Sequence, residues 1–247
     1  MIICASRRTD IPAFFGDWFM NRLAEKKVSV RNPVNPKMIT EIKLEPDVIE
    51  CIIFWTKNPE NFLKRLPAID ALGYRYYFQF TLTPYDTTIE RKVDKTTIVE
   101  TFITLSKYCG KEKVIWRYDP IFLNDTCTMQ YHLEKFESLC STLCNYTEKC
   151  VISFIDSYPF LAKTFKQNSI SEPSDNEIDV LADSFSAIAK KYHVPLFTCG
   201  EKIDLARYGI AHTKCIDDGL IERLFNLKVK SKKDPSQRLE CGCCVSR

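Results

Sequence analysis

The clearest local signal in this chain is the stretch SDNEIDVLADSFSAIAKKYHVPLFTCGE, residues 174–201. Ser174 and Glu177 have the spacing of a capping box, in which each side chain satisfies a free backbone N–H at a helix start. The apolar side chains after them recur at i, i+3 and i+4, which predicts one buried stripe on a helix. The members of this stripe are Ile178, Leu181, Ala182, Phe185, Ile188, Ala189 and Tyr192. An apolar run at 195–198 then ends in polar residues, so the stretch predicts a helix followed by a strand.

The same alternation of strand and helix extends outward over the rest of the chain. The predicted strands are short and apolar, and all but the first are rich in Val, Ile, Phe, Tyr or Trp. They fall at 2–5, 48–55, 74–82, 113–116, 150–155 and 195–198. The remaining predicted helices fall at 14–26, 59–71, 96–109, 133–144 and 216–226. This order calls for a parallel sheet with right-handed crossovers.

We therefore expect an α/β fold, a full or partial (β/α) TIM-like barrel with about six parallel strands. Residues 1–227 would form this barrel domain. Residues 228–247 differ in composition, because a basic, polar linker leads into a cysteine-rich end. We expect this tail to be pinned back onto the barrel.

Composition excludes several classes of protein. The 247 residues include 35 Lys and Arg against 32 Asp and Glu, and 45% of the residues are apolar, so a disordered or fibrous chain is excluded. A net charge of +3 gives no argument for nucleic acid or for an anionic membrane. The first ten residues contain no apolar signal core, and no stretch approaches the roughly 20 apolar residues of a membrane span. The sequence thus predicts a cytoplasmic protein.

Each predicted strand becomes polar or charged at its carboxyl end. In parallel α/β folds these ends converge on one face, where ligand sites form. We expect this face to bind a small anionic or zwitterionic ligand, since cations and carboxylates would meet there. The candidate residues are Arg7, Arg8, Asp10, Lys57, Asn58, Gln79, Arg117, Asp119, Asp156 and Glu201. The alternative is that these charges form salt bridges that tie the strand ends together.

Other catalytic patterns are missing from the sequence. The chain has only three histidines, and His132 falls within a predicted helix, so a Ser–His–Asp hydrolase or a histidine-based metal centre is a poor interpretation. There is no Walker-type loop or GxGxxG motif among the seven glycines, which argues against the usual modes of nucleotide-phosphate binding.

Twelve cysteines are the one unusual count, and in a reducing compartment clustered thiols indicate metal ligands rather than disulfides. Cys51, Cys140, Cys144 and Cys150 fall in strands or on apolar helix faces, which favours core packing. A second group comprises Cys199, Cys215 and the terminal segment Cys241-Gly-Cys-Cys244. Thiolates from these three places would close a four-sulfur site for zinc or an iron–sulfur cluster. Unligated thiols near a frayed end are the alternative.

The strand-end motifs together resemble the bacterial domain of unknown function family 1848. They stand in the order Ser6-Arg-Arg-Thr-Asp-Ile-Pro12, Phe54-Trp-Thr-Lys-Asn-Pro59, Phe78-Gln-Phe-Thr-Leu82, Trp116-Arg-Tyr-Asp-Pro120, Ser153-Phe-Ile-Asp156, Cys199-Gly-Glu-Lys-Ile-Asp204, Cys215-Ile-Asp217 and Cys241-Gly-Cys243. This resemblance covers essentially the whole chain. Family members typically continue into a CxxxCxxC cluster like that of radical S-adenosylmethionine enzymes, whose three thiolates hold a [4Fe–4S] cluster.

The resemblance implies a metal site on Cys199, Cys215, Cys241 and Cys243, with Cys244 as the alternative to Cys243. The sequence contains no CxxxCxxC and stops at Arg247, so it implies a radical-type barrel truncated before its catalytic cluster. S-adenosylmethionine would then bind only to a longer form.

Three functions are open at this point. The first is a radical S-adenosylmethionine-type iron–sulfur enzyme barrel, inactive as given. The second is a metal-stabilised binding protein that holds an anionic small ligand without turnover. The third is a nucleic-acid binder, but a basic run is usually a solvated linker, which argues against it. The basic residues in question are Lys228, Lys230, Lys232, Lys233 and Arg238.

Overall fold

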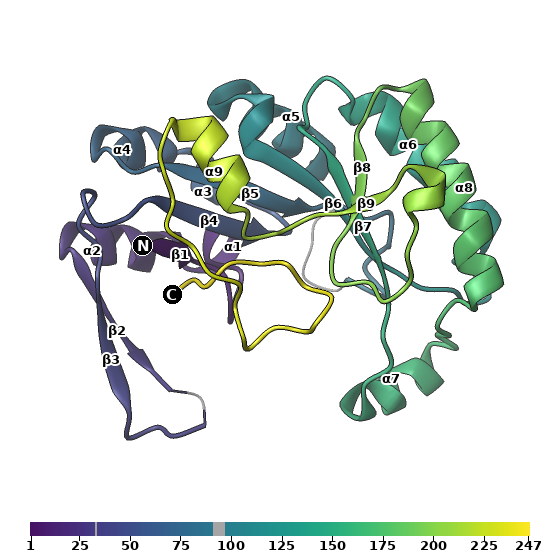
Figure 1. The fold of residues 1–247 in the computed structure, drawn as a ribbon, viewed down its shortest axis with the longest axis horizontal. Helices are drawn as coiled ribbons and strands as arrows, with labels where there is room; N and C mark the ends of the chain where they lie inside the picture. The colour runs from purple at the N-terminus through teal and green to yellow at the C-terminus, as the bar shows by residue number, and fades with distance from the viewer. Residues whose placement is uncertain (33, 91–96) are drawn as a thin grey trace. The chain divides into compact units, whose positions relative to one another are not determined.

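The computed structural model describes residues 1–32, 34–90 and 97–247, which form a mixed α/β fold with seven parallel strands. Contacts divide the chain into two compact units. Figure 1 labels the helices and strands of both. The first unit contains residues 1–80, 216–235 and 243–247. The second contains residues 81–215 and 236–242.

In the first unit, three strands pair in parallel in the order β1–β4–β5. They are β1 (Ile2–Cys4), β4 (Cys51–Thr56) and β5 (Tyr76–Thr81). The unit also has an antiparallel hairpin of β2 (Lys27–Arg31) and β3 (Ile39–Lys43). Its helices are α1 (Ile11–Phe14), α2 (Gly16–Ala24), α3 (Glu60–Leu63), α4 (Leu66–Ala71) and α9 (Asp218–Phe225).

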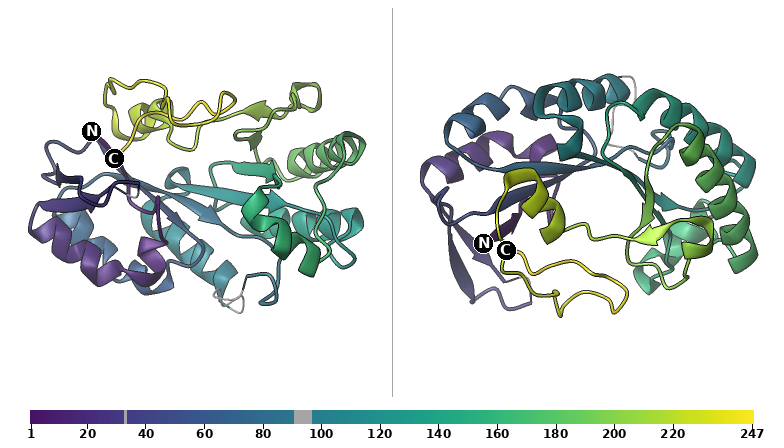
Figure 2. Two further views of the ribbon diagram at one scale, coloured as in Figure 1. Left: turned by 90° about the horizontal axis from the view of Figure 1, so that it is seen from below. Right: turned by 45° about the horizontal axis from the view of Figure 1, so that its top comes forward.

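In the second unit, four strands pair in parallel in the order β6–β7–β8–β9. They are β6 (Val114–Ile121), β7 (Cys150–Phe154), β8 (Leu196–Thr198) and β9 (Ala211–His212). Its α-helices are α5 (Ile98–Cys109), α6 (Met129–Leu143), α7 (Ala162–Gln167) and α8 (Asp175–Lys191). Short 3-10 turns occur at Lys111–Lys113, Pro159–Leu161 and Ala206–Tyr208. Figure 2 shows α6 and α8 side by side along the strands of this unit.

The six strands expected from the sequence are all present, and the described residues form three more, β9 in the parallel sheet and β2 and β3 in the hairpin. The strand order establishes a mixed α/β fold with parallel strands. A closed barrel is not shown, so barrel closure stays a prediction, as does the expected division at residue 227. The helix expected at 59–71 is two helices, because Pro67 lies in the first turn of α4, where a proline starts a helix. Of the helix expected at 96–109, residue 96 lies outside the described part.

Aromatic side chains fill the core of each unit. In the first unit, Phe54 of β4 is fully buried and its ring lies 5.0 Å from Phe62 and 5.1 Å from Phe78. In the second unit, Trp116 of β6 stacks on Phe136 of α6 at 5.3 Å. Successive side chains of a strand point to opposite faces, so the neighbours of Trp116 in β6 face away from these helices. This alternation places Arg117 and Asp119 together on the face of β6 away from α6.

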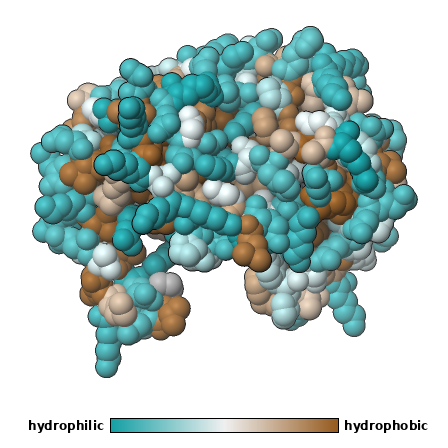
Figure 3. Space-filling model, in the orientation of Figure 1, coloured by the Kyte–Doolittle hydropathy of each residue, from teal (hydrophilic) through white to brown (hydrophobic). Residues whose placement is uncertain are grey.

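The β2–β3 hairpin was not expected from the sequence. Side chains of β2 alternate between exposed and half-buried, and neither face of the hairpin is packed into a core. Two of its apolar residues are exposed, Val34 at 92% and Ile39 at 59%. Figure 3 shows hydrophobic surface, coloured brown, on this hairpin. A strand without a buried face has no apolar run, which is the signal that identified the other strands. None of the described helices is long and apolar enough to cross a membrane.

Candidate functional site

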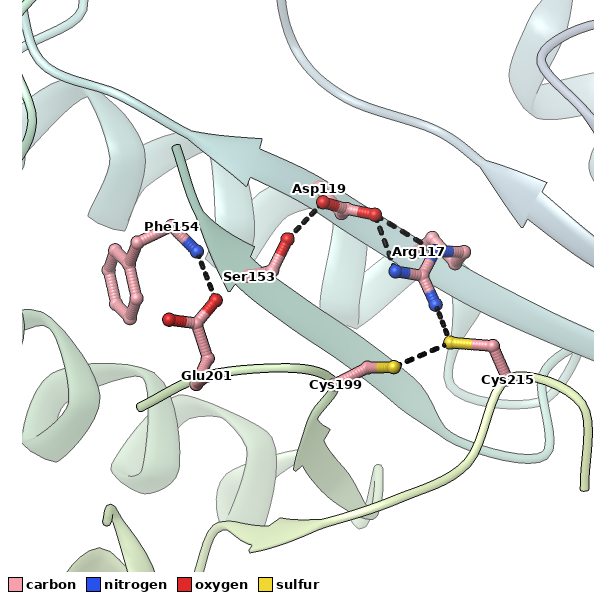
Figure 4. A network of polar contacts seen from close by, with 7 residues as sticks. All are labelled: Arg117, Asp119, Ser153, Phe154, Cys199, Glu201 and Cys215. Carbon is pink, nitrogen blue, oxygen red and sulfur yellow. Dashed lines mark hydrogen bonds and ion pairs between the residues drawn. The ribbon is translucent and has the colours of Figure 1, made fainter. Parts of the chain in front are cut away.

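The carboxyl ends of β6, β7 and β8 bring polar side chains together in the second unit (Figure 4). The pairing register of these three strands explains why the side chains lie together. Val151 of β7 pairs with Arg117 of β6 and with Phe197 of β8. Residues two positions further along each strand share the same face. Those residues are Asp119, Ser153 and Cys199.

Arg117 is the centre of the contact network in Figure 4. Its side chain is only 4% exposed. The guanidinium donates through Nε and Nη2 to Asp119 Oδ2, at 2.9 and 2.5 Å, and through Nη1 to Cys215 Sγ at 2.8 Å. Burial alone lowers the pKa of an arginine, but the charges of Cys215 and Asp119 outweigh it and raise the pKa of Arg117. Arg117 therefore stays a cation inside the protein.

Asp119 is held from both sides. Arg117 donates to one carboxylate oxygen, and the hydroxyl of Ser153 donates to the other. The Asp119 side chain keeps 20% of its surface exposed, so this carboxylate is accessible to solvent. Sequence reasoning missed Ser153 as a functional residue, because it lies within a strand and contacts Asp119 only through the pairing of β6 with β7.

In the second unit, Cys199 lies close to two other predicted metal-ligating cysteines. Cys199 follows β8, and its Sγ lies 2.8 Å from that of Cys215. The Sγ of Cys241 lies within 4.8 Å of that of Cys199. Cys215 and Cys241 are buried and Cys199 is half-buried. Thiols this close in a buried place are a donor set for a soft metal ion.

Cys243 and Cys244 belong to the first unit. The Sγ of Cys243 accepts a hydrogen bond from the backbone N–H of Ile216 at 3.5 Å. The thiol of Cys244 is directed to the hydroxyl of Ser231 at 3.3 Å. Their membership in the predicted four-sulfur site remains a prediction. Cys140 and Cys150 are fully buried, in agreement with core packing.

Glu201 is the second carboxylate at this edge of the second unit. It accepts a hydrogen bond from the backbone N–H of Phe154 at 2.8 Å. Burial raises the pKa of Glu201 to about 7, and Asp156 and Asp119 add to the rise, whereas the bond from Phe154 opposes it. Near neutral pH this carboxyl group therefore populates both its protonated and its ionised form.

Asp156 pairs with Arg238, a residue that the sequence placed in the basic linker. The two side chains are 2.6 Å apart, and each is close to half exposed. The Arg238 guanidinium also lies over the ring of Tyr158 at 5.7 Å. No local pattern could have indicated this pair, because it joins residues far apart in the chain.

In the first unit, the carboxyl ends of β1 and β4 are joined by Asp10. Its carboxylate accepts hydrogen bonds from the backbone N–H groups of Lys57, at 2.7 Å, and Ala13, at 3.0 Å. Burial raises the pKa of Asp10 against these opposing bonds. The Asn58 side chain accepts from the backbone N–H of Glu60 at 3.0 Å and so shapes the turn into α3. These contacts give Asp10 and Asn58 a structural role.

The remaining predicted residues of the first unit have protein partners or lie in the core. Arg7 pairs with Asp234 at 3.4 Å, and Arg8 donates to the backbone oxygen of Arg31 at 2.7 Å. Gln79 is fully buried in β5. For Arg7, the salt-bridge alternative accounts for the contact that the structure shows.

The sequence matches one family over nearly its whole length. The model of the domain of unknown function DUF1848 covers residues 2–247. The chain belongs to this family. No curated protein matches the DUF1848 chain in sequence.

Among solved structures, one similar to this DUF1848 protein is described as "a putative alpha-L-fucosidase from Bacteroides thetaiotaomicron VPI-5482". The two are 11% identical, the match covers 66% of each chain, and the TM-score is 0.35. The chain thus spans just under two thirds of that structure. At this TM-score the likeness carries no argument about function.

Proposed function

We propose that this DUF1848 protein is a metalloenzyme whose thiolate centre lies at the carboxyl edge of β6, β7 and β8. The observation that carries the proposal is that Cys199 lies close both to Cys241 and to Cys215, and that Cys215 contacts the buried cation of Arg117. The sequence adds Cys243 as the fourth ligand. The metal would be zinc or an iron–sulfur cluster.

The donor set fits such a centre chemically. Thiolates are the preferred protein ligands of zinc and of iron–sulfur clusters. A buried thiolate is costly unless it is paired, and the Arg117 guanidinium supplies positive charge 2.8 Å from Cys215.

The side chains around the centre would bind and orient a small anionic or zwitterionic ligand. Arg238 offers a half-exposed guanidinium to an anionic group. Asp119 and Glu201 lie at the same edge and would hold a cationic group or a hydroxyl. In the radical S-adenosylmethionine-type chemistry that the family resemblance suggests for a longer form, a cluster would supply one electron to the cofactor. The protein residues would orient the ligand and exclude water.

A metal-stabilised binding protein without turnover is the second candidate. It is favoured by the fact that Arg117 is already bonded to Asp119 and Cys215. Four thiolates also make a closed site that leaves no position for a substrate. In this case the metal would hold the cysteine-bearing segments together, and the ligand would bind nearby.

The metal content of the protein tests the proposal. Anaerobically purified protein should contain about one zinc ion, or iron and sulfide in cluster ratio, per chain. Cys199→Ser and Cys215→Ser should lose most of it, whereas Cys109→Ser, at the end of α5, should keep it. Protein that is metal-free and cannot be reconstituted with zinc or with iron and sulfide would refute the metal centre.

The kind of metal separates the two candidates. Iron and sulfide in cluster ratio, with the electron paramagnetic resonance signal of a reduced cluster, would support the iron–sulfur enzyme. Zinc in stoichiometric amount, with no iron, would support the binding protein.

A further inference from the structure

We infer that Arg117 is a positioning residue for the thiolate centre: its guanidinium, anchored by Asp119 and Ser153, holds Cys215 in place and sets the electron density on its sulfur. This inference rests on the proposed metal centre and deepens it. It concerns a residue that is not itself a ligand.

The contact between Arg117 and Cys215 is short and buried. Nη1 lies 2.8 Å from the sulfur, and the two residues are 4% and 2% exposed. A guanidinium is planar and cannot lose its proton inside a protein, so a buried one needs anionic partners. Asp119 provides one such partner through two hydrogen bonds. The second partner is the sulfur of Cys215.

Asp119 determines the orientation of the Arg117 guanidinium through the N–H groups that do not contact the sulfur of Cys215. Nε and Nη2 both donate to Asp119 Oδ2, which gives the group one plane and one direction. The other oxygen of Asp119 accepts from Ser153, so the carboxylate cannot turn freely. Ser153, Asp119 and Arg117 thus form a chain of contacts that ends on Cys215 (Figure 4).

Such a chain has the form of an outer shell around a metal site. Groups that hydrogen-bond to metal ligands orient them and tune the centre, and their removal typically costs 10- to 100-fold in metal affinity. An N–H donor on a thiolate also withdraws electron density from the sulfur. Hydrogen bonds to the sulfurs are one of the factors that set the potential of iron–sulfur clusters.

The test uses Zn²⁺ and Co²⁺ as probes on the full-length, reduced, metal-free chain. Zn²⁺ affinity is measured by competition with a chromophoric chelator, and Co²⁺ gives a sulfur-to-metal charge-transfer band. The variants are Arg117→Gln, Arg117→Lys and Asp119→Asn. Arg207→Gln is the matched control, because Arg207 pairs with Asp179 on an exposed surface of the same unit.

Arg117→Gln should bind Zn²⁺ about 10- to 100-fold more weakly than the wild type. Its Co²⁺ charge-transfer band should move to lower energy, because the sulfur regains electron density. Arg117→Lys keeps the positive charge but loses the planar set of N–H donors of the guanidinium. It should therefore bind Zn²⁺ more tightly than Arg117→Gln but less tightly than the wild type. Asp119→Asn should show a smaller loss than Arg117→Gln, and Arg207→Gln none.

The outcomes distinguish this inference from the proposed function. If the wild type binds neither metal, both fail. If the wild type binds and the Arg117 variants match it in affinity and in band position, only the inference fails. Circular dichroism of the metal-free variants checks folding. Should Arg117→Gln not fold, wild-type affinity and band position in Arg117→Lys and Asp119→Asn together would overturn the inference.

Discussion

The histidine of α6 is held in one protonation state by the groups that face it. His132 of α6 is fully buried, with Nε2 2.8 Å from the backbone oxygen of Phe122 and Nδ1 2.9 Å from the hydroxyl of Tyr118. A carbonyl only accepts, so Nε2 carries the proton and Nδ1 accepts from the tyrosine. Both ring nitrogens are therefore used by the neutral imidazole, which makes His132 a packing residue.

This arrangement predicts a loss of stability in mild acid. Burial lowers the pKa of His132 below its ordinary value, although the bond to Phe122 opposes the shift. The unfolded chain thus takes up the proton first, and stability falls as the pH drops from about 6.5 through the lower pKa of the folded state. Urea unfolding at pH 7.5 and pH 5 should show a smaller pH dependence for His132→Asn than for the wild type. His193→Asn, at an exposed position, should retain the wild-type dependence, and equal pH dependence in all three proteins would contradict the assignment.

Elements were predictable where one face of them is buried. The capping box and apolar stripe of α8 appear in the structure as expected, with Ser174 N–H donating to Glu177 at 2.8 Å. The register of β6, β7 and β8 then carries Asp119 and Cys199 to one edge, so these candidates were accessible from the sequence. Arg238 was not, because its ion pair depends on how a distant loop returns to β7. The β2–β3 hairpin could not be predicted from the sequence either, since it lacks a buried face.

Removal of the cap of α8 should destabilise the protein measurably. Ser174→Ala loses the acceptor for the Glu177 N–H and should lower the free energy of unfolding by about 1 kcal/mol. Ser184→Ala makes the same change within the helix, where alanine is the better helix former, and should cause no loss. Urea unfolding curves of the two variants provide the measurement. Equal midpoints would show that the box contributes nothing.

The aromatic core of the first unit should be sensitive to truncation. Phe54 contacts Phe19, Phe62 and Phe78, and it is fully buried. Phe54→Ala should cost about 3–5 kcal/mol, because it removes buried surface and leaves a cavity. Val34→Ala, on the exposed hairpin, should change stability by less than about 0.5 kcal/mol. Thermal unfolding followed by circular dichroism compares them, and a similar small effect in both would argue against this core.

At the scale of the whole molecule, the C-terminal residues contribute to both compact units. Residues 228–235 and 243–247 belong to the first unit, where the N–H of Val245 bonds to the oxygen of Lys232 at 2.9 Å. Residues 236–242 belong to the second unit and carry Arg238 and Cys241. Little apolar surface holds this segment, since Leu239 is 88% exposed. Ordering the segment costs about 1–2 kcal/mol per residue, which the ion pair of Arg238 alone does not offset.

Metal ligation by Cys241 would supply the missing stabilisation, and limited proteolysis can detect it. We expect that trypsin cleavage after Arg238 requires residues 236–242 to open. Zn²⁺ at about 100 times its Kd adds about 2.7 kcal/mol against any opening that releases the metal, which corresponds to about hundredfold slower cleavage. Cys241→Ser should be cut at one rate with and without Zn²⁺.

Cleavage at Lys27, on the hairpin, serves as the internal control and should not respond to the metal. If Zn²⁺ protects the site after Arg238 equally in Cys241→Ser, Cys241 is not a ligand; if it protects neither protein, the metal does not hold this segment.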